Sequence, residues 1–429
     1  MREDLKNKNG SSDGPRPARG KFRFALPLAL VLLVSAAAVF YARRNLGTTA
    51  APGAGSGHGS NASAALSGKE TTNAASTATN RPTDHTGGVT YIHDEVEEVP
   101  WSIHVVKVDR SYKNLRLETT LGLGRHLGMS PVSEQVKAIP AEVGHPLAAI
   151  NGDFYKISSK YPGDPEGVQI IRGELVSAPR PTHSCFWTDA AGNPHVATVQ
   201  SRLKVTLPNG SAATPGLNEK RADDAAVLYT AATGASTGTG DGVELVLSRS
   251  STNGHWLPLR VGETYTAQVK QVRTNGNAPL SRETMVLSVG PRISTQVAGL
   301  KPGDAVTIST ATLPSLAGSP TAIGGGPALV HDRTAGKFTD LLRHPRSAFG
   351  WNKDYFFLVE VDGRQKISAG MNFSELAAYM LKLGCDEAIN LDGGGSATMW
   401  VYGNVMNSPS EGRERPAANA LVVVRKAPD

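Results

Sequence analysis

Beyond residue 88 the chain is a succession of short apolar segments separated by turn residues, and this pattern limits the folds open to it. Apolar runs of this length between turn signals are typical of β-strands. We expect strands at these ranges: 101–108, 114–120, 146–150, 167–171, 195–198, 203–207, 225–229, 243–247, 265–272, 285–288, 305–308, 356–361, 388–391 and 420–424.

Two segments favour helices instead. One covers residues 132–139, and the clearer one follows Ser374, which we expect to cap it, and ends at Gly384. The sequence therefore predicts the α/β (mixed α+β) class, with one domain over residues 89–429 that has a mixed, mostly β core and few helices.

Residues 24–42 are 19 residues without a charge, long enough for a helix to cross a hydrocarbon core of ~30 Å. Basic residues are concentrated before this stretch, so residues 1–23 are expected in the cytoplasm and the rest outside it. We predict a single-pass membrane protein with its folded domain in the periplasm or at the cell exterior. A cleaved signal peptide is the alternative, although its apolar region would be unusually long.

Residues 43–88 are mostly Gly, Ala, Ser, Thr and Asn. Such a segment has too little apolar surface to offset the entropy of ordering, so a flexible linker is expected.

The net charge of +6 resides in residues 1–44, which hold nine Lys/Arg and three Asp/Glu. The remainder is balanced, and no basic surface for a nucleic-acid partner is implied. The two cysteines, Cys185 and Cys385, exclude a disulfide scaffold and a zinc ribbon. A bridge between them and two unpaired buried thiols both remain open.

Three apolar strands run into turns that hold glycine and a polar side chain, at residues 148–155, 322–327 and 389–396. Strand ends are where scaffolds present catalytic groups. In the last turn Gly393, Gly394 and Gly395 could direct N–H groups at an anion, with Asp392 at the mouth and Ser396 beside it. An ordinary tight turn is the alternative.

The other candidates are single polar groups around these turns. Asn151 and Asp153 follow the first strand, where a hairpin is the alternative interpretation. Gly324 and Gly325 could form a second anion site. Arg346 could clamp a phosphate with two parallel donors. Further candidates are an acid at a strand end, Glu360, and a loop arginine, Arg415. Anion sites, arginines and carboxylates together suit a substrate with a phosphate and a glycosidic centre.

No Walker A run or dinucleotide-binding glycine motif is present. Five segments in this order resemble the phosphodiester glycosidase family: 149–155, 323–329, 345–350, 390–396 and 415–420. The resemblance covers residues 90–426. It implies a mixed α/β domain that hydrolyses a sugar-1-phosphodiester, N-acetylglucosamine-1-phosphodiester-like, at the glycosidic bond. By motif match it places five residues at the site: Asn151, Asp153, Arg346, Asp392 and Ser396.

We therefore expect an enzyme of cell-envelope or exopolysaccharide glycan. Arg346 and the Gly393–Gly395 N–H groups would hold the phosphate, while Asp153 and Asp392 flank the anomeric carbon. No cofactor is required, although Asp392 could bind a divalent cation. A non-catalytic glycan-binding module and a phosphodiesterase that cuts the P–O bond are the alternatives.

Overall fold

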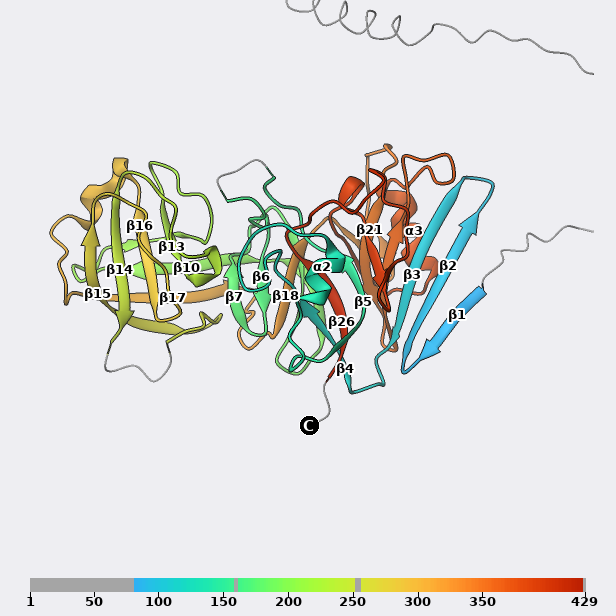
Figure 1. Cartoon of the computed structure of the whole chain (residues 1–429), viewed down its shortest axis with the longest axis horizontal. Coiled ribbons are helices and arrows are strands. Elements are labelled where there is room, and N and C mark those ends of the chain that lie inside the picture. The colour runs from blue at the N-terminus through green and yellow to red at the C-terminus, as the bar shows by residue number, and fades with distance from the viewer. Residues whose placement is uncertain (1–80, 158–160, 251–255, 427–429) are drawn as a thin grey trace, which may run out of the picture. The chain divides into compact units, whose positions relative to one another are not determined.

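A computed structural model describes residues 81–157, 161–250 and 256–426 (Figure 1). The expected segments 1–23 and 24–42 lie outside the described residues, as does most of the expected linker. Among the helices that the structure describes, none has the length and apolarity to cross a membrane. Strand β1 (Arg81–Thr86) pairs with β2 (Val89–Val96), so paired structure begins inside the segment expected to be linker.

The first sheet has eight strands in the order β1-β2-β3-β22-β21-β23-β19-β20. Its remaining strands are β3 (Trp101–Asp109), β22 (Tyr355–Val361), β21 (Arg346–Trp351), β23 (Glu387–Asn390), β19 (Ala328–His331) and β20 (Thr334–Ala335). Alternation along β3 and β22 gives this sheet two buried faces. Ile103 and Val359 face helix α3 (Phe373–Lys382), whereas Val106 and Leu358 face the second sheet.

Helix α3 is capped by Asn372, two residues before the Ser374 cap that the sequence suggested. The side chain of Asn372, not Ser374, accepts the N–H of Glu375 at 2.9 Å, and the Glu375 carboxylate returns a 3.0 Å bond from the Asn372 N–H. This capping box satisfies two helix-end donors at once, which a serine two positions later cannot do. The expected end at Gly384 agrees with the structure, since the helix is capped by Leu383.

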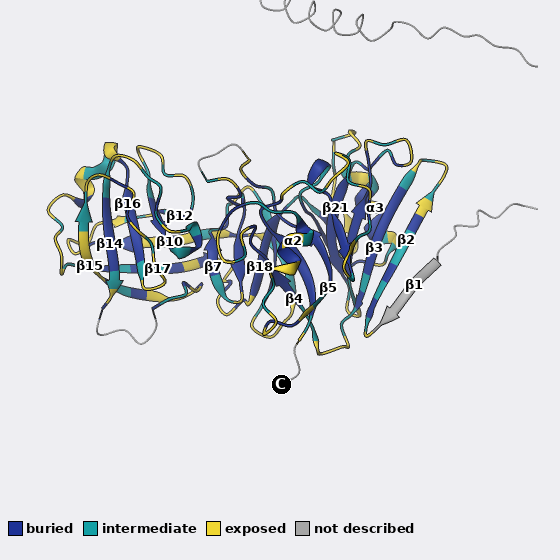
Figure 2. Ribbon diagram, viewed as in Figure 1, coloured by how far each residue is buried: buried dark blue, intermediate teal, exposed yellow. Residues whose placement is uncertain are grey.

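The second sheet has five strands in the order β25-β24-β5-β26-β4. They are β25 (Asn404–Val405), β24 (Met399–Val401), β5 (His145–Asn151), β26 (Ala420–Arg425) and β4 (Leu115–Thr119). One face packs on the first sheet through Ile150 and Leu421, and the other on helix α2 (Val132–Lys137) through Val422. Strands β5, β24 and β26 are buried along most of their length, as Figure 2 shows for β5.

Two further sheets come from the chain between β5 and β19. The five-stranded sheet, in the order β7-β6-β18-β8-β9, contains β7 (Glu174–Ser177), β6 (Gln169–Ile171), β18 (Thr321–Gly325), β8 (Ser184–Thr188) and β9 (Pro194–Thr198). The eight-stranded sheet, in the order β11-β10-β17-β15-β14-β16-β13-β12, contains β11 (Ala212–Ala213), β10 (Gln200–Thr206), β17 (Ala305–Leu313), β15 (Thr264–Arg273), β14 (Val243–Arg249), β16 (Thr284–Val289), β13 (Ala226–Tyr229) and β12 (Gly216–Leu217). Both contribute to one apolar core.

The mostly β core with few helices is confirmed. Within the described residues there are two α-helices and three short 3₁₀ turns, η1 (Ala231–Thr233), η2 (Pro291–Val297) and η3 (Gly394–Ser396). The described strand pairs are antiparallel apart from β12 with β13. Cys185 and Cys385 are both free and buried, in separate cores, so the unpaired alternative holds.

Candidate active site

The chain segments that follow β5, β18 and β23 meet at a cleft of about 610 Å³. Its walls include side chains and glycines from all three segments, together with Arg415, which precedes β26: Phe154, Tyr155, Glu166, Gly325, Asp392 and Arg415. Two of these segments are separated by more than 200 residues of sequence. Strand ends distant in the chain therefore form one pocket.

Asn151 fixes the position of the Asp392 turn. Its Nδ2 donates to the Asp392 carbonyl at 2.6 Å, and its Oδ1 accepts from the Ser347 hydroxyl at 2.6 Å and the Thr398 N–H at 3.1 Å. The Asp392 N–H donates in turn to the Gly152 carbonyl at 2.8 Å. Asn151 is fully buried. These bonds occupy its amide, so the side chain supports the turn and does not face the cleft.

Asp153 lies beneath the cleft with 1% of its surface exposed. Its Oδ2 accepts the Gly167 N–H at 2.7 Å, and its own N–H donates to Asn419 Oδ1 at 2.7 Å. Its Oδ1 has no hydrogen-bond partner among the described residues. The pKa of this carboxyl is raised to about 8, mainly by burial, and the nearby charge of Asp392 contributes in the same direction.

Asp392 lines the cleft itself. Burial raises the pKa of its carboxyl to about 6, against the lowering effects of Ser396, the Gly393 N–H and the Arg415 charge. Two neighbouring carboxyls with unequal acidity are the usual arrangement of an acid and a base in one site. At neutral pH Asp392 is mainly ionised and Asp153 mainly protonated.

The glycine turn differs from the expected anion site. The Gly393 N–H donates to Asp392 Oδ1 at 2.9 Å, and the Gly394 N–H donates to the Pro345 carbonyl at 2.8 Å. Two of the three expected donors are thus engaged within the protein. Ser396 is buried beside Asp392, and its hydroxyl lowers the pKa of that carboxyl.

Gly324 and Gly325 allow close approach of other groups. A Cβ on Gly324 would lie 2.2 Å from Asp153 Oδ2, and one on Gly325 would lie 2.6 Å from the Asn390 carbonyl. Neither position tolerates a side chain without movement of its neighbours. Gly325 lines the cleft, whereas Gly324 packs over Asp153. Their direct role is to admit Asp153 and β23, not to form a second ring of anion donors.

Arg346 does not line the cleft, contrary to the phosphate clamp that we expected. Its Nε donates to the Met371 carbonyl at 2.9 Å, its guanidinium stacks on Phe373 at 4.0 Å, and an Nη lies 3.5 Å from Asp340. The sequence motif brings its backbone beside the glycine turn, but the side chain extends toward the start of α3. These contacts hold the guanidinium within the protein.

Other arginines lie at the turn instead. Arg415 lines the cleft, forms a close ion pair with Glu411, and covers the Cα of Gly395. Arg364, which our sequence reasoning did not single out, comes within 3.1 Å of a Cβ placed on Gly394. Glu166 and His183 also line the cleft, 3.7 Å apart. They lie in loops without a motif, so no sequence signal identifies them.

Glu360 lies away from this cleft. It is fully buried on β22, and burial raises the pKa of its carboxyl well above the ordinary value, with the charge of Asp362 adding to the effect. Neither of its oxygens has a hydrogen-bond partner among the described residues. Glu360 is therefore not among the residues that line the cleft.

Comparison with known proteins gives a family. Residues 261–424 match the model of the phosphodiester glycosidase family. This part of the chain is therefore similar to the phosphodiester glycosidases. The matched range includes Asp392, Ser396 and Arg415 but ends short of Asp153 on the N-terminal side.

The similar curated proteins match over short segments. A prophage-derived uncharacterised protein of Bacillus subtilis, YomE, is 36% identical over 83 residues, which are 19% of this chain and 13% of that protein. The N-acetylglucosamine-1-phosphodiester alpha-N-acetylglucosaminidase of Bos taurus is 42% identical over 67 residues, 15% of this chain and 12% of that protein. The matches therefore span about an eighth of each relative's length.

Among solved structures, a hypothetical protein from Synechocystis has the same fold. The two align with a TM-score of 0.65 and 18% identity, over 82% of this chain and 64% of that one. At this identity the likeness concerns the fold alone.

Proposed function

We propose that this chain is a hydrolase that cleaves the glycosidic bond of a sugar-1-phosphodiester, N-acetylglucosamine-1-phosphodiester-like, in cell-envelope or exopolysaccharide glycan. The observation that carries the proposal is the pair of carboxyls of Asp392, which lines the cleft, and Asp153, which is buried beneath it, with pKa values of about 6 and about 8. The family of residues 261–424 supports a glycosidase.

In the proposed reaction Asp392 takes a proton from water while the water oxygen bonds to the anomeric carbon, or its carboxylate attacks that carbon first. The bond between the anomeric carbon and the phosphate oxygen breaks, and its electron pair leaves with the phosphate monoester. Asp153 is the group that holds a proton at neutral pH and can return one to that oxygen. The products are the free sugar and the phosphate monoester.

We propose the substrate contacts from the residues that line the cleft. Arg415 replaces Arg346 as the proposed phosphate ligand, because its guanidinium lies at the cleft and its charge lowers the pKa of Asp392. If a substrate phosphate displaced Glu411 from Arg415, the guanidinium would remain paired with an anion. Phe154 and Tyr155 line the same wall and offer aromatic faces for a sugar ring.

Hydrolysis in ¹⁸O-water tests the proposal with UDP-N-acetylglucosamine and a teichoic-type diester as probes. Glycosidic cleavage places the label in the released sugar. Label in the phosphate indicates a P–O phosphodiesterase, and saturable binding without release indicates a glycan-binding module. Either result overturns the proposal.

The matched variants are Asp392→Asn and Asp332→Asn. The first should lower turnover by about 10²–10⁴-fold, the range for removal of a general base. The second makes the same chemical change at a side chain that is 88% exposed, outside the cleft, and should leave turnover unchanged.

We further propose that residues 24–42 anchor the enzyme, which places the domain outside the cytoplasm. The uncharged length of this segment and the basic residues before it support the anchor. Membrane fractionation followed by N-terminal sequencing tests it. A mature protein that starts beyond residue 40 would indicate a cleaved signal peptide.

A further inference from the structure

A row of polar side chains crosses the inner face of the first sheet. The strand register places His93 opposite His104, His104 opposite Glu360, and Glu360 opposite Ser347, across β2, β3, β22 and β21. Residues directly opposed in a sheet point to the same face. The same face carries Val106 and Leu358 in its apolar part. These polar side chains interrupt an otherwise apolar buried face, so they need hydrogen-bond or charge partners.

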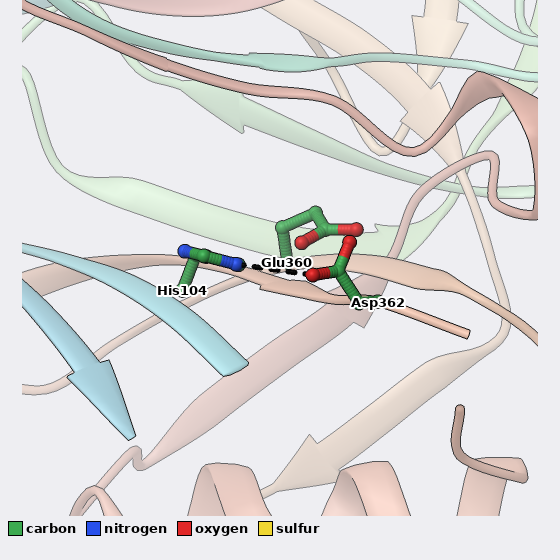
Figure 3. A group of neighbouring side chains, drawn as sticks. All are labelled: His104, Glu360 and Asp362. Carbon is green, nitrogen blue, oxygen red and sulfur yellow. Dashed lines mark hydrogen bonds and ion pairs between the residues drawn. The ribbon is translucent and has the colours of Figure 1, made fainter. Parts of the chain in front are cut away.

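Two ionisable groups of this row, His104 and Glu360, converge with Asp362, which follows β22. His104, Glu360 and Asp362 each offer one ligand atom, and these atoms all lie within 4.8 Å of one another. The residues are 3%, 0% and 2% exposed. Figure 3 shows the imidazole of His104 and the two carboxylates gathered around one point between β3 and β22.

Glu360 gives an independent indication that a ligand is required. Both of its oxygens are buried and without a hydrogen-bond partner among the described residues. No Lys or Arg forms an ion pair with Glu360 or Asp362 in the described part of the chain, where the recorded pair is His104 with Asp362. An unpaired buried carboxylate is strongly unfavourable, so a cation between the two acids would supply the missing charge.

The separation of His104 and Asp362 also fits two ligands of one ion. His104 Nε2 lies 3.3 Å from Asp362 Oδ2, longer than the ~2.7–2.9 Å of a charge-assisted hydrogen bond. Two atoms bound at ~2.05 Å to a tetrahedral metal are separated by ~3.3 Å. Nδ1 of His104 lies 2.7 Å from the Tyr91 hydroxyl, which fixes the ring with Nε2 directed at the carboxylates.

Asp362 is held from two further sides. Its Oδ1 accepts the Ser408 N–H at 2.8 Å, and its Oδ2 accepts the Ser102 hydroxyl at 3.1 Å. The Ser102 hydroxyl also lies 3.4 Å from His104 Nε2 and 2.9 Å from His93 Nε2. Such outer contacts orient the ligands of a metal site.

We propose that His104, Glu360 and Asp362 bind one divalent transition-metal ion of the Zn²⁺ or Mn²⁺ class. One imidazole nitrogen with two carboxylates is a donor set that these ions accept, whereas Ca²⁺ and Mg²⁺ prefer oxygen ligands alone. The site lies away from the cleft and has a structural role, so the proposal does not depend on the hydrolase activity.

The ion would brace the loop that carries the catalytic turn. Ser408 is tied to Asp362, and the adjacent Asn407 accepts the Met399 N–H at 2.8 Å and donates to the Ala397 carbonyl at 3.2 Å. Residues 397–399 directly follow Ser396. A cation that fixes Asp362 therefore holds the chain on the far side of the Asp392 turn.

The test measures metal content and melting temperature of the full-length chain. The protein is stripped with a chelator, dialysed separately against Zn²⁺, Mn²⁺, Mg²⁺ and Ca²⁺, and analysed by inductively coupled plasma mass spectrometry. We expect one equivalent of Zn²⁺ or Mn²⁺ and a melting temperature raised by roughly 3–8 °C at a hundredfold excess over Kd. Glu360→Gln and Asp362→Asn should each bind at most a fifth of the wild-type amount.

Glu387→Gln is the matched control. Glu387 belongs to a similar group with His331 and Asp332, which is exposed, and this variant should keep the full equivalent. The proposal is overturned if wild-type protein takes up no ion, if only Mg²⁺ or Ca²⁺ binds, or if uptake depends on Glu387 and survives in Glu360→Gln. No uptake together with a stabilised Glu360→Gln would indicate a carboxyl pair that shares a proton. If Glu360→Gln does not fold, uptake by the wild type and by the control decides alone.

Discussion

Substitution of Gly324 by alanine tests the packing under the candidate active site. The added Cβ would lie 2.2 Å from Asp153 Oδ2, 2.6 Å from Asp153 Cγ and 2.8 Å from the Gly167 Cα. Ordinary van der Waals contacts are 3.4–4 Å long, so either Asp153 must leave its position or β18 must move out of register with β8. Both strands lie in the interior of their sheet, which makes movement of Asp153 the smaller change.

The expected cost has two parts. Overpacking in a well-filled interior destabilises by about 1–3 kcal/mol. Displacement of Asp153 also breaks the 2.7 Å bond from the Gly167 N–H, and a buried partner left unsatisfied costs about 1–3 kcal/mol. We therefore expect the free energy of unfolding to fall by ~2–5 kcal/mol, with loss of turnover under conditions where the variant is still folded.

Urea denaturation followed by fluorescence measures the first quantity, and turnover of the nucleotide-sugar probe measures the second. Gly240→Ala is the control, because a Cβ there meets nothing within 4 Å, and its unfolding free energy should change by less than ~1 kcal/mol. A Gly324→Ala protein with wild-type stability and rate would refute the packing between Gly324 and Asp153.

Three further predictions concern ionisation and charge at the site. The pH–rate profile should be bell-shaped, because activity requires ionised Asp392 together with protonated Asp153. Roughly four-fifths of molecules have this pair of states at pH 7, and about a tenth have it at pH 5 and at pH 9. A flat profile across this range contradicts the assignment. The unfolding free energy should decrease as pH rises from about 4 to about 8, since the folded state keeps the Asp153 proton that the unfolded chain releases, and Asp153→Asn should flatten this slope in denaturation curves. Arg415→Ala should lower turnover with little change in melting temperature, because Arg415 lines the cleft. Arg346→Ala should lower the melting temperature, because the Arg346 guanidinium is bound within the protein. The reverse pattern would restore Arg346 as the phosphate ligand.

The sequence predicts the cleft better than it predicts the contacts within it. Short apolar strands run into three turns, at residues 148–155, 322–327 and 389–396, and the structure brings these turns together. The direction of a long side chain is not encoded in such a motif. Arg346 follows Pro345 beside the glycine turn, yet its guanidinium finds the Met371 carbonyl and Phe373, which lie 25 and more residues away in sequence.

The roles of glycine show a similar limit. A run of glycines predicts that another part of the protein or a ligand lies close to the backbone, but the sequence does not identify that group. At Gly324 it is the Asp153 carboxylate, and at Gly393 it is the Pro345 carbonyl, 2.6 Å from an added Cβ. Helix α3 shows the limit for local signals, since Asn372 and Ser374 are both good caps and only the reciprocal bond with Glu375 selects the first.

The polar row on the first sheet also affects how the strands align. Side chains alternate between faces, so a slip of β22 by one residue against β3 would carry Glu360 and Asp362 to the face covered by α3, among Ala377 and Met380. The buried cluster described on that face contains no histidine. The misaligned sheet would separate both acids from His104 and bury them beside apolar side chains of α3. The correct pairing of β3 with β22 is thereby favoured over its nearest competitors during folding.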